Sequence, residues 1–398
     1  MNKIFFIVIF IIFNVTLSFS SQIDVIDLSK QKWEYRWGDS VFEKNIPLWT
    51  DKNIDPTQWK EIAFPSNPPL RNEQTNVWYR IKLPDTLTKD PTLYISSIDL
   101  VAQVYLNGKQ IYHFGDFDEQ GKGSFQGWPW HMISLPSHSA GDYLYFRVYS
   151  NYSDIGLWGE VFISSQGYIF KKLLHEDIPK IMIGSVAVFV GVLFLLSFIS
   201  RRKRIEFFIL GLLFISQGLD IVISAKILEL YLYFPLLKQY ILAAVFFFFP
   251  IGMALFMDKT IQKKVPFNLI RRIWQIHLLY FIGAIFGALL GFFSIASTYD
   301  YFDMLYNFFS LPILTLFMIY FFFTGDKETK LITFSFFLIS LYWVYSYLSA
   351  HMMLSWGEFP SEVAVFSCLL FLSYFVITKL NYADDLQKEK DTLEIISS

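Results

Sequence analysis

The stretch Ile178–Ser200 reads IPKIMIGSVAVFVGVLFLLSFIS, and Arg201, Arg202, Lys203 and Arg204 follow it directly. A helix of about 20 apolar residues crosses the roughly 30 Å of hydrocarbon in a bilayer. Basic residues directly after such a run are typical of the cytoplasmic end of a span. This stretch therefore predicts a membrane helix and divides the chain into two parts with different solvents.

Further apolar segments follow at regular intervals: Ile205–Ser224, Leu237–Met257, Ile273–Phe293, Met304–Thr324, Leu331–Ala350 and Glu362–Lys379. A helix at the surface of a soluble protein has one polar and one apolar face. These segments have no polar face. Together with Ile178–Ser200 they predict an all-α bundle of seven transmembrane helices over residues 178–379.

The charges between the segments predict the orientation of the bundle. Basic residues are frequent after the first, third and fifth segments, whereas 295–303 and 351–361 contain no Lys or Arg. Positive charge is retained in the cytoplasm. The region before the first span is therefore expected outside the cytoplasm, the C-terminus inside, and the protein in the cytoplasmic membrane.

The N-terminus supports the same orientation. Lys3 precedes the apolar run Ile4–Phe13, and the small residues Ser18 and Ser20 follow it. This pattern predicts a signal peptide over residues 1–20, cleaved after Ser20. The alternative is an uncleaved membrane helix, for which the apolar run is short.

The composition excludes several classes of function. The chain of 398 residues is 54% hydrophobic and 17% charged, and its net charge of -2 gives no reason to expect nucleic acid as a partner. The single cysteine, Cys368, cannot form an intrachain disulfide. The histidines show no metal-ligand spacing, and no lysine is buried in a span where a retinal-type cofactor would need one. We expect neither a metal nor a cofactor.

Residues 22–172 have the pattern of short strands. Val77, Tyr79 and Ile81 alternate with polar or aromatic residues, and Leu144–Val148 alternates in the same way. A period of two predicts strands with one buried face. Asn107-Gly108 lies between two apolar runs and predicts a tight hairpin turn, because both residues accept positive φ. We therefore expect an extracytoplasmic all-β sandwich.

The order of several residues in this region resembles that of a known domain family. The chain carries, in sequence, Trp59, Pro65, Trp78-Tyr79-Arg80, Leu83-Pro84, Val104–Lys109 (VYLNGK) and Leu144–Val148 (LYFRV). This order resembles the sugar-binding, galactose-binding-like jelly-roll domain that accompanies glycoside hydrolases of family 2. The resemblance implies a jelly-roll sandwich and carries over no catalytic carboxylate pair.

The whole architecture resembles the bacterial seven-transmembrane receptors with diverse intracellular signalling modules. The resemblance implies an outer domain that binds small ligands, often carbohydrates, and helices that signal to a cytoplasmic module. This chain departs from the pattern, because no output domain follows its last span. Residues 380–398 predict a short cytoplasmic helical stub, either a solvated helix end or the start of a dimeric coiled coil. The effector is then expected either on a separate chain or on a C-terminal part that a truncation has removed from this sequence.

The ligand-binding residues that we predict lie on two expected loops. Gly127–His131 reads GWPWH, and aromatic rings on a loop can stack on a sugar ring while polar groups bind its hydroxyls. The hypothesis places Trp128, Trp130, His131, Tyr152 and Trp158 around a site. The alternative is that the tryptophans fill the sandwich core or pack on the helices.

Polar residues inside the apolar segments are the second group of candidates. Asp220, Gln275 and His277 lie in the second and fourth segments. Ionisable groups at membrane depth are costly and often functional. For His277 the alternative is a hydrogen bond between helices, and Asp220 lies near the outer end of its segment, where water reaches it.

The sequence therefore predicts a signalling receptor for a small extracytoplasmic ligand, and not an enzyme. One alternative is a transporter or channel with an outer substrate-capturing domain. The other is a membrane-bound glycan-processing enzyme, which requires two carboxylates about 5–10 Å apart. Asp116, Asp118 and Glu119 are the nearest candidates, and their spacing favours a solvated turn.

Overall fold

The computed structural model describes residues 25–51, 56–64, 67–200, 205–261 and 268–350, with 371, 373 and 374. The predicted signal peptide, the cytoplasmic stub and most of Glu362–Lys379 lie outside the described residues. The chain forms two compact units. The β unit comprises the chain up to Pro179 together with Lys226–Gln239, and the helical unit comprises Lys180–Ala225 and the chain from Tyr240 onward.

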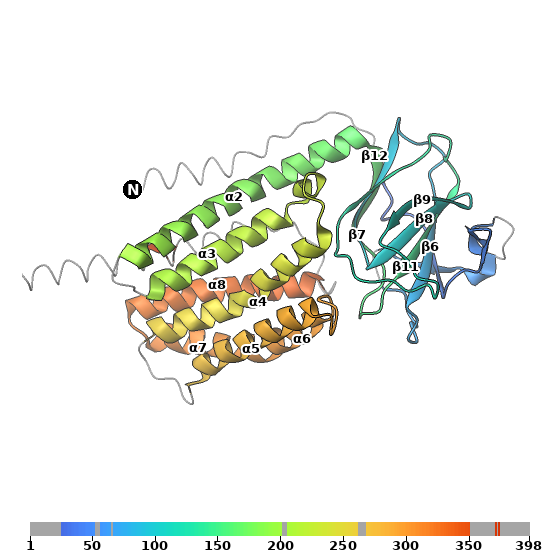
Figure 1. Ribbon diagram of the computed structural model, residues 1–398. Coiled ribbons are helices and arrows are strands. Elements are labelled where there is room, and N and C mark those ends of the chain that lie inside the picture. The colour runs from blue at the N-terminus through green and yellow to red at the C-terminus, as the bar shows by residue number, and fades with distance from the viewer. Residues whose placement is uncertain are drawn as a thin grey trace, which may run out of the picture. The chain divides into compact units, whose positions relative to one another are not determined.

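The β unit consists of antiparallel sheets (Figure 1). A four-stranded sheet has the order β1 (Ile26–Asp27), β12 (Leu157–Ser165), β7 (Pro91–Ile98) and β10 (His131–Ser134). A six-stranded sheet has the order β5 (Lys60–Ile62), β2 (Trp33–Trp37), β6 (Asn76–Lys82), β11 (Tyr143–Tyr149), β8 (Val101–Leu106) and β9 (Lys109–Phe114). A ribbon of β3 (Phe42–Glu43) and β4 (Ile46–Pro47) precedes the 3-10 turns Leu48–Thr50 and Pro56–Gln58.

One apolar core joins the two large sheets. Val77, Tyr79 and Ile81 of β6 share a buried cluster with residues of β7 and β12, so the sheets face each other as a sandwich. The predicted order of a β region followed by helices is confirmed. The predicted hairpin is also confirmed, because Leu106 pairs with Lys109 and the turn residues Asn107 and Gly108 have φ angles of 50° and 76°.

The expectation of a single buried face is wrong for β6. Trp78 and Arg80, on the side opposite the core, are also buried. They lie beneath an outer aromatic layer that includes Trp49, Trp59 and Tyr105. The Arg80 guanidinium lies 4.5 Å from the centre of the Trp59 ring, and its Nε donates to Glu34 at 2.6 Å. Cation–π contact and ion pairing together allow a charged side chain to be covered.

Several apolar helices follow the strands, and most of their residues belong to the helical unit. In the part of the chain that the structure describes, five helices are long and apolar enough to cross a membrane, which indicates a membrane protein: α2 (Gln166–Ser200), α3 (Ile205–Ser224), α4 (Pro235–Thr260), α5 (Leu269–Leu289) and the run Thr298–Thr324. That run joins α6 (Thr298–Leu305) to α7 (Leu311–Thr324) through a π-helical turn, Tyr306–Ser310. Helix α8 (Lys327–Ala350) follows, and the 3-10 turn η3 (Lys226–Leu230) lies between α3 and α4.

The predicted spans agree with these helices to different degrees. The bounds of α3 are those predicted. Helix α2 begins at Gln166 rather than Ile178, because the polar residues before the apolar run are also helical. Helix α5 ends at Leu289 rather than Phe293, before Gly291 with its positive φ. Seven spans are not shown: the predicted sixth, Leu331–Ala350, lies in α8, which is not among the five, and most of the seventh falls on residues that the structure leaves undescribed.

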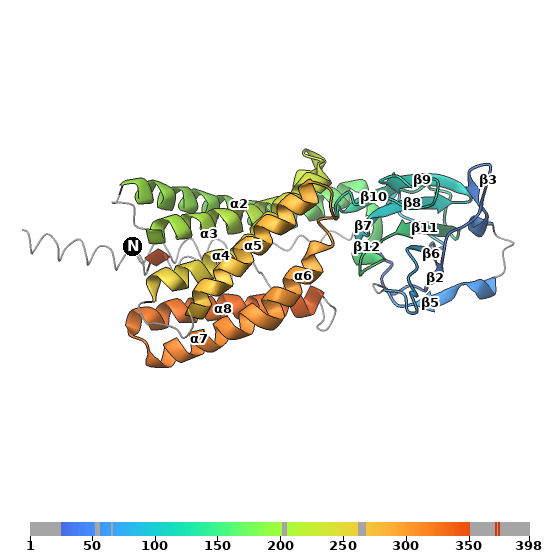
Figure 2. The ribbon, with the colours of Figure 1, turned by 60° about the horizontal axis from the view of Figure 1, so that its bottom comes forward.

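Helices α2 and α3 lie side by side through glycines (Figure 2). A Cβ atom on Gly218 would lie 2.6 Å from the Gly184 carbonyl oxygen, and one on Gly191 would lie 2.8 Å from that of Gly211. On each of these two antiparallel helices the two glycines are seven residues apart. Glycine lets the two backbones approach closely, as small residues commonly do between membrane helices.

Replacing Gly218 should therefore separate these helices. We expect Gly218→Leu to lower the free energy of unfolding by about 1–3 kcal/mol, the usual cost of overpacking. Gly283→Leu in α5 is the matched control, since nothing lies within 4 Å of its Cβ position. Equilibrium unfolding of the detergent-solubilised protein measures both. Equal losses in the two variants would contradict the close contact of α2 and α3.

Candidate ligand-binding site

A buried carboxylate lies at one end of the sandwich. Asp99 lies in the tight turn between β7 and β8, where Leu100 has a φ of 41°. Its side chain is almost fully buried, and its backbone N–H donates to the Gly156 carbonyl at 3.1 Å. A buried carboxylate is stable only when hydrogen-bond donors surround it. Asp99 therefore organises the side chains next to it.

Two of the predicted ligand-binding residues supply those donors. The Tyr152 hydroxyl donates to Asp99 Oδ1 at 2.7 Å, and the Trp158 indole Nε1 donates to Oδ2 at 2.5 Å. The ring of Trp128 lies 5.7 Å from that of Tyr152, centre to centre. The Tyr152 hydroxyl and the Trp158 indole are turned to Asp99, and all three aromatic side chains are half-buried, so part of each stays accessible. We call Asp99, Trp128, Tyr152 and Trp158 the Asp99 cluster.

The loop 150–156 that carries Tyr152 is held in place by two side chains from earlier in the chain. The Arg71 guanidinium donates to the carbonyls of Ser150, Tyr152 and Ser153 at 2.6–2.8 Å. Asn67 donates to the Asp154 carboxylate at 2.7 Å and accepts the N–H of Ile155 at 2.9 Å. A site fixed in this way loses little conformational entropy on binding.

The protonation state of Asp99 is unusual. Burial raises the pKa of its carboxyl to about 7, and the nearby Asp154 acts in the same direction, while the hydrogen bonds from Trp158 and Tyr152 oppose the rise. Near neutral pH this group exists in both charged and neutral forms. The cluster can therefore accept a hydrogen bond from a ligand hydroxyl or donate one to it.

Trp130 and His131 make their contacts with residues outside the Asp99 cluster. The Trp130 ring stacks on Tyr94 of β7 at 5.8 Å, and its Nε1 donates to the carbonyl of Lys226 at 2.9 Å. The Lys226 ammonium in turn donates to the Tyr94 hydroxyl at 2.8 Å. Trp130 thus packs on the segment between α3 and α4, within the β unit. This arrangement corresponds to the packing alternative of the sequence analysis.

His131 is fully buried and belongs to a strand rather than to a loop. It begins β10, and its Nδ1 is hydrogen-bonded to the Tyr112 hydroxyl at 2.8 Å. Burial lowers the pKa of the His131 imidazole to about 3, so it is neutral at physiological pH. Trp158 is likewise on a strand, the start of β12, where Gly159 with a φ of 77° introduces a bulge. Neither lies on the loop where the sequence placed it.

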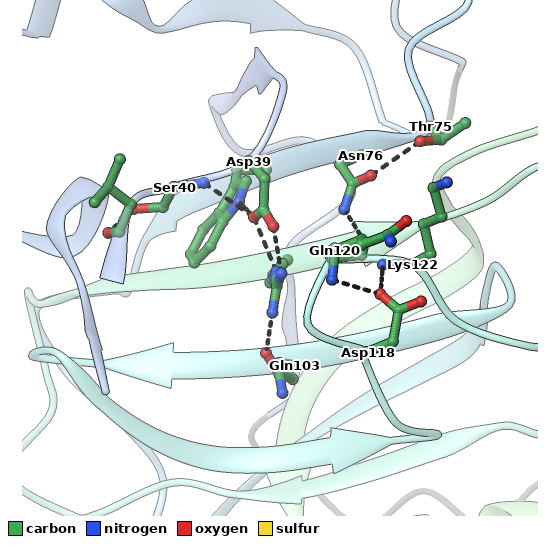
Figure 3. A network of polar contacts seen from close by, with 12 residues as sticks. Asp39, Ser40, Thr75, Asn76, Gln103, Asp118, Gln120 and Lys122 are labelled. Carbon is green, nitrogen blue, oxygen red and sulfur yellow. Dashed lines mark hydrogen bonds and ion pairs between the residues drawn. The ribbon is translucent and has the colours of Figure 1, made fainter. Parts of the chain in front are cut away.

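A second polar network lies on the outer face of the six-stranded sheet, and Figure 3 shows it around Asp39, Asn76 and Gln103. The Arg147 guanidinium is ion-paired with Asp39, which also accepts the Trp78 indole N–H at 2.9 Å. The Asn76 amide donates to the Gly121 carbonyl at 2.6 Å. Because these groups bind one another, the network anchors two loops to the sheet.

The polar candidates in the apolar helices differ from one another in burial. His277 of α5 is buried, and its Nε2 is hydrogen-bonded to the Ser310 hydroxyl at 2.9 Å. Gln275 is exposed on the same helix, and Asp220 is half-buried in the last turn of α3. Among the residues that the structure describes, no group of three His, Cys, Asp or Glu side chains could hold a metal ion.

Similarity to solved structures is partial. The chain is 15% identical to a β-glucuronidase of Bacteroides uniformis, over 36% of this chain and 18% of that one, with a TM-score of 0.27. It is 12% identical to a family 2 β-galacturonidase of Eisenbergiella tayi bound to galacturonate, over 38% of this chain and 26% of that one, with a TM-score of 0.26.

A β-glucuronidase of Faecalibacterium prausnitzii is 14% identical, over 38% of this chain and 33% of that one, with a TM-score of 0.27. The chain thus spans a third or less of the length of these enzymes. At such identities and TM-scores the likeness identifies neither a ligand nor an activity. No family model matches the sequence, and no curated protein matches it.

The two perturbed groups of the sandwich predict opposite effects of pH on stability. Folded Asp99 retains its proton up to about pH 7 while the unfolded chain releases it near pH 3.8, so its contribution to stability falls as pH rises through this window. Folded His131 stays neutral down to about pH 3 while the unfolded chain binds a proton below about 6.5, so its contribution rises with pH.

Single substitutions should separate the two effects. We expect Asp99→Asn to leave the rise from His131, and His131→Gln to leave the fall from Asp99, with slopes of up to about 1.4 kcal/mol per pH unit. Unfolding of the detergent-solubilised full chain between pH 4 and 7 measures the slopes. Identical pH profiles in both variants would show that neither group is buried as described.

Proposed function

We propose that this chain is a membrane receptor that binds a small ligand at the Asp99 cluster and signals through its helices. A sugar is the ligand class that fits the cluster best. Accessible aromatic rings can stack on the apolar face of a pyranose, and Asp99 can exchange a bond to Tyr152 or Trp158 for a bond to a hydroxyl. The bound ligand then favours one arrangement of these side chains over another.

One observation carries the proposal. Trp128 and Trp130 are two residues apart, and they contact different parts of the β unit. Trp128 packs on Tyr152 of the Asp99 cluster, and Trp130 donates a hydrogen bond to Lys226, which precedes α4 and directly follows α3. A ligand that displaces Trp128 therefore acts through a short, covalently continuous segment on the connection between two membrane helices.

A population shift is sufficient for the signal. A ligand that prefers one arrangement of residues 127–131 biases the connection η3 and with it the ends of α3 and α4. The basic residues after the first, third and fifth apolar segments support a sandwich outside the cytoplasmic membrane and a cytoplasmic C-terminus. The output partner in this proposal is a cytoplasmic signalling effector, and residues 380–398 are its proposed contact and a candidate dimer element.

Binding without hydrolysis is part of this proposal. Asp118, one of the acidic residues that a glycan-processing enzyme would need, accepts the backbone N–H groups of Gln120 and Lys122 at 2.8 Å and closes its own turn. A transporter with a capturing domain remains the alternative function. It requires uptake of the ligand by the reconstituted protein, whereas a receptor binds the ligand without moving it.

A ligand screen on the full-length protein tests the proposal. We expect a neutral sugar to raise the melting temperature of the detergent-solubilised protein, and calorimetry to give its affinity. Trp128→Ala should weaken that affinity about tenfold, because it removes one stacking ring. Trp49→Phe in the outer aromatic layer is the control and should leave the affinity unchanged.

Two results would contradict the binding site. The first is a sugar whose affinity is the same in wild type and in Trp128→Ala. The second is a sugar whose affinity falls equally in Trp128→Ala and in Trp49→Phe, which would indicate general destabilisation of the sandwich rather than loss of a contact.

A further inference from the structure

The connection between α3 and α4 has an unusual surface. Residues 230–237 read LYLYFPLL and contain no charged side chain. Tyr231 is 83% exposed, Leu232 64% and Phe234 63%, and Leu230, Tyr233, Leu236 and Leu237 are exposed as well. Contiguous exposed apolar surface of this kind marks a site of interaction.

A hydrogen bond joins this connection to α2 near the start of the apolar run of that helix. The backbone N–H of Ile227 donates to the Asp177 carboxylate of α2 at 2.7 Å, and all of these residues belong to the β unit. Lys180 is the last charged residue of α2 before its apolar run begins. At a rise of about 1.5 Å per residue, Asp177 lies less than one helical turn before Lys180. The connection therefore lies level with the start of the hydrocarbon span.

The charges that flank the connection are already engaged. Lys238 is ion-paired with Glu229, and the Lys226 ammonium donates to the Tyr94 hydroxyl. A protein partner would be expected to find polar groups around the apolar patch, and here those groups are turned inward. Tyrosine, by contrast, suits the boundary of a bilayer, since its ring is apolar and its hydroxyl is hydrated.

We infer that residues 230–237 form a lipid-contact element that lies in the boundary between headgroups and acyl chains on the side of the β unit. Continuity supports this occupant, because α4 begins at Pro235 and continues directly into an apolar span. The element is independent of the proposed signalling function, since it requires neither a ligand nor an effector.

The element also attaches the sandwich to the bilayer. The backbone of Gly127, with a φ of 102°, lies so close to Pro235 that a Cβ atom would approach the Pro235 carbonyl carbon and oxygen to 2.6 Å. Lipid contact at Pro235 and its neighbours therefore restrains the segment that carries Trp128 and Trp130.

Fluorescence quenching in vesicles tests the inference. The sole cysteine is first removed as Cys368→Ala, and single cysteines are introduced as Leu232→Cys or Val41→Cys and labelled with an environment-sensitive fluorophore. The two positions are matched, because Leu232 is 64% and Val41 66% exposed. The full chain is reconstituted in phosphatidylcholine with and without brominated acyl chains, after each variant is shown to keep the melting temperature of the cysteine-free parent.

The label at 232 should be quenched by the brominated lipid and should show a several-fold lower iodide quenching constant than the label at 41. Two outcomes would overturn the inference. Equal iodide quenching at both positions would place the connection in water. Protection from iodide without quenching by brominated lipid would show that protein, such as a second copy of the chain, covers it. Phe234→Cys, 63% exposed, replaces Leu232→Cys if that variant does not fold.

Discussion

The hydrogen bond from the Trp130 indole to the Lys226 carbonyl is the contact on which the account depends. It joins the sandwich, which carries the proposed ligand site, to the connection between α3 and α4. Such a bond contributes only about 1 kcal/mol to stability. Trp130 also stacks on Tyr94, and the Tyr94 hydroxyl accepts a hydrogen bond from the Lys226 ammonium. The three contacts form one small assembly. A coupling energy of about 1–3 kcal/mol is typical of allosteric proteins, so an assembly of this size is adequate.

The Asp99 cluster and the His131 site differ in what burial does to them. Burial disfavours the charged form of both groups. Asp99 accepts hydrogen bonds from Tyr152 and Trp158, and its pKa is about 7. His131 has one hydrogen-bond partner and is neutral throughout the physiological range. Asp99 is thus the group of the two whose charge changes near neutral pH. His131 acts as a polar core residue that holds β9 and β10 together through Tyr112.

Sequence patterns predicted the features that depend on local chemistry. Asn107-Gly108 specifies its hairpin by backbone conformation alone, and the apolar run of α3 specifies its own ends. The patterns could not predict contacts between distant segments. Asp99 is a single acidic residue between two apolar strands, and nothing near it in sequence indicates that Tyr152 and Trp158 will bind it. Trp78 and Arg80 are buried because Phe42, Trp49 and Trp59 pack over this face of the sheet, which no periodicity in β6 reveals.

Hydrogen–deuterium exchange on the full-length protein in detergent tests the central claim most directly, by comparing wild type with Trp130→Phe. The variant keeps the stacking ring and removes the indole donor. The account predicts faster exchange of the backbone amides in residues 226–232, with unchanged exchange in the β8–β9 hairpin. Unchanged exchange in residues 226–232 would contradict the account, because the connection would then hold its structure without the sandwich and no signal could pass through Trp130.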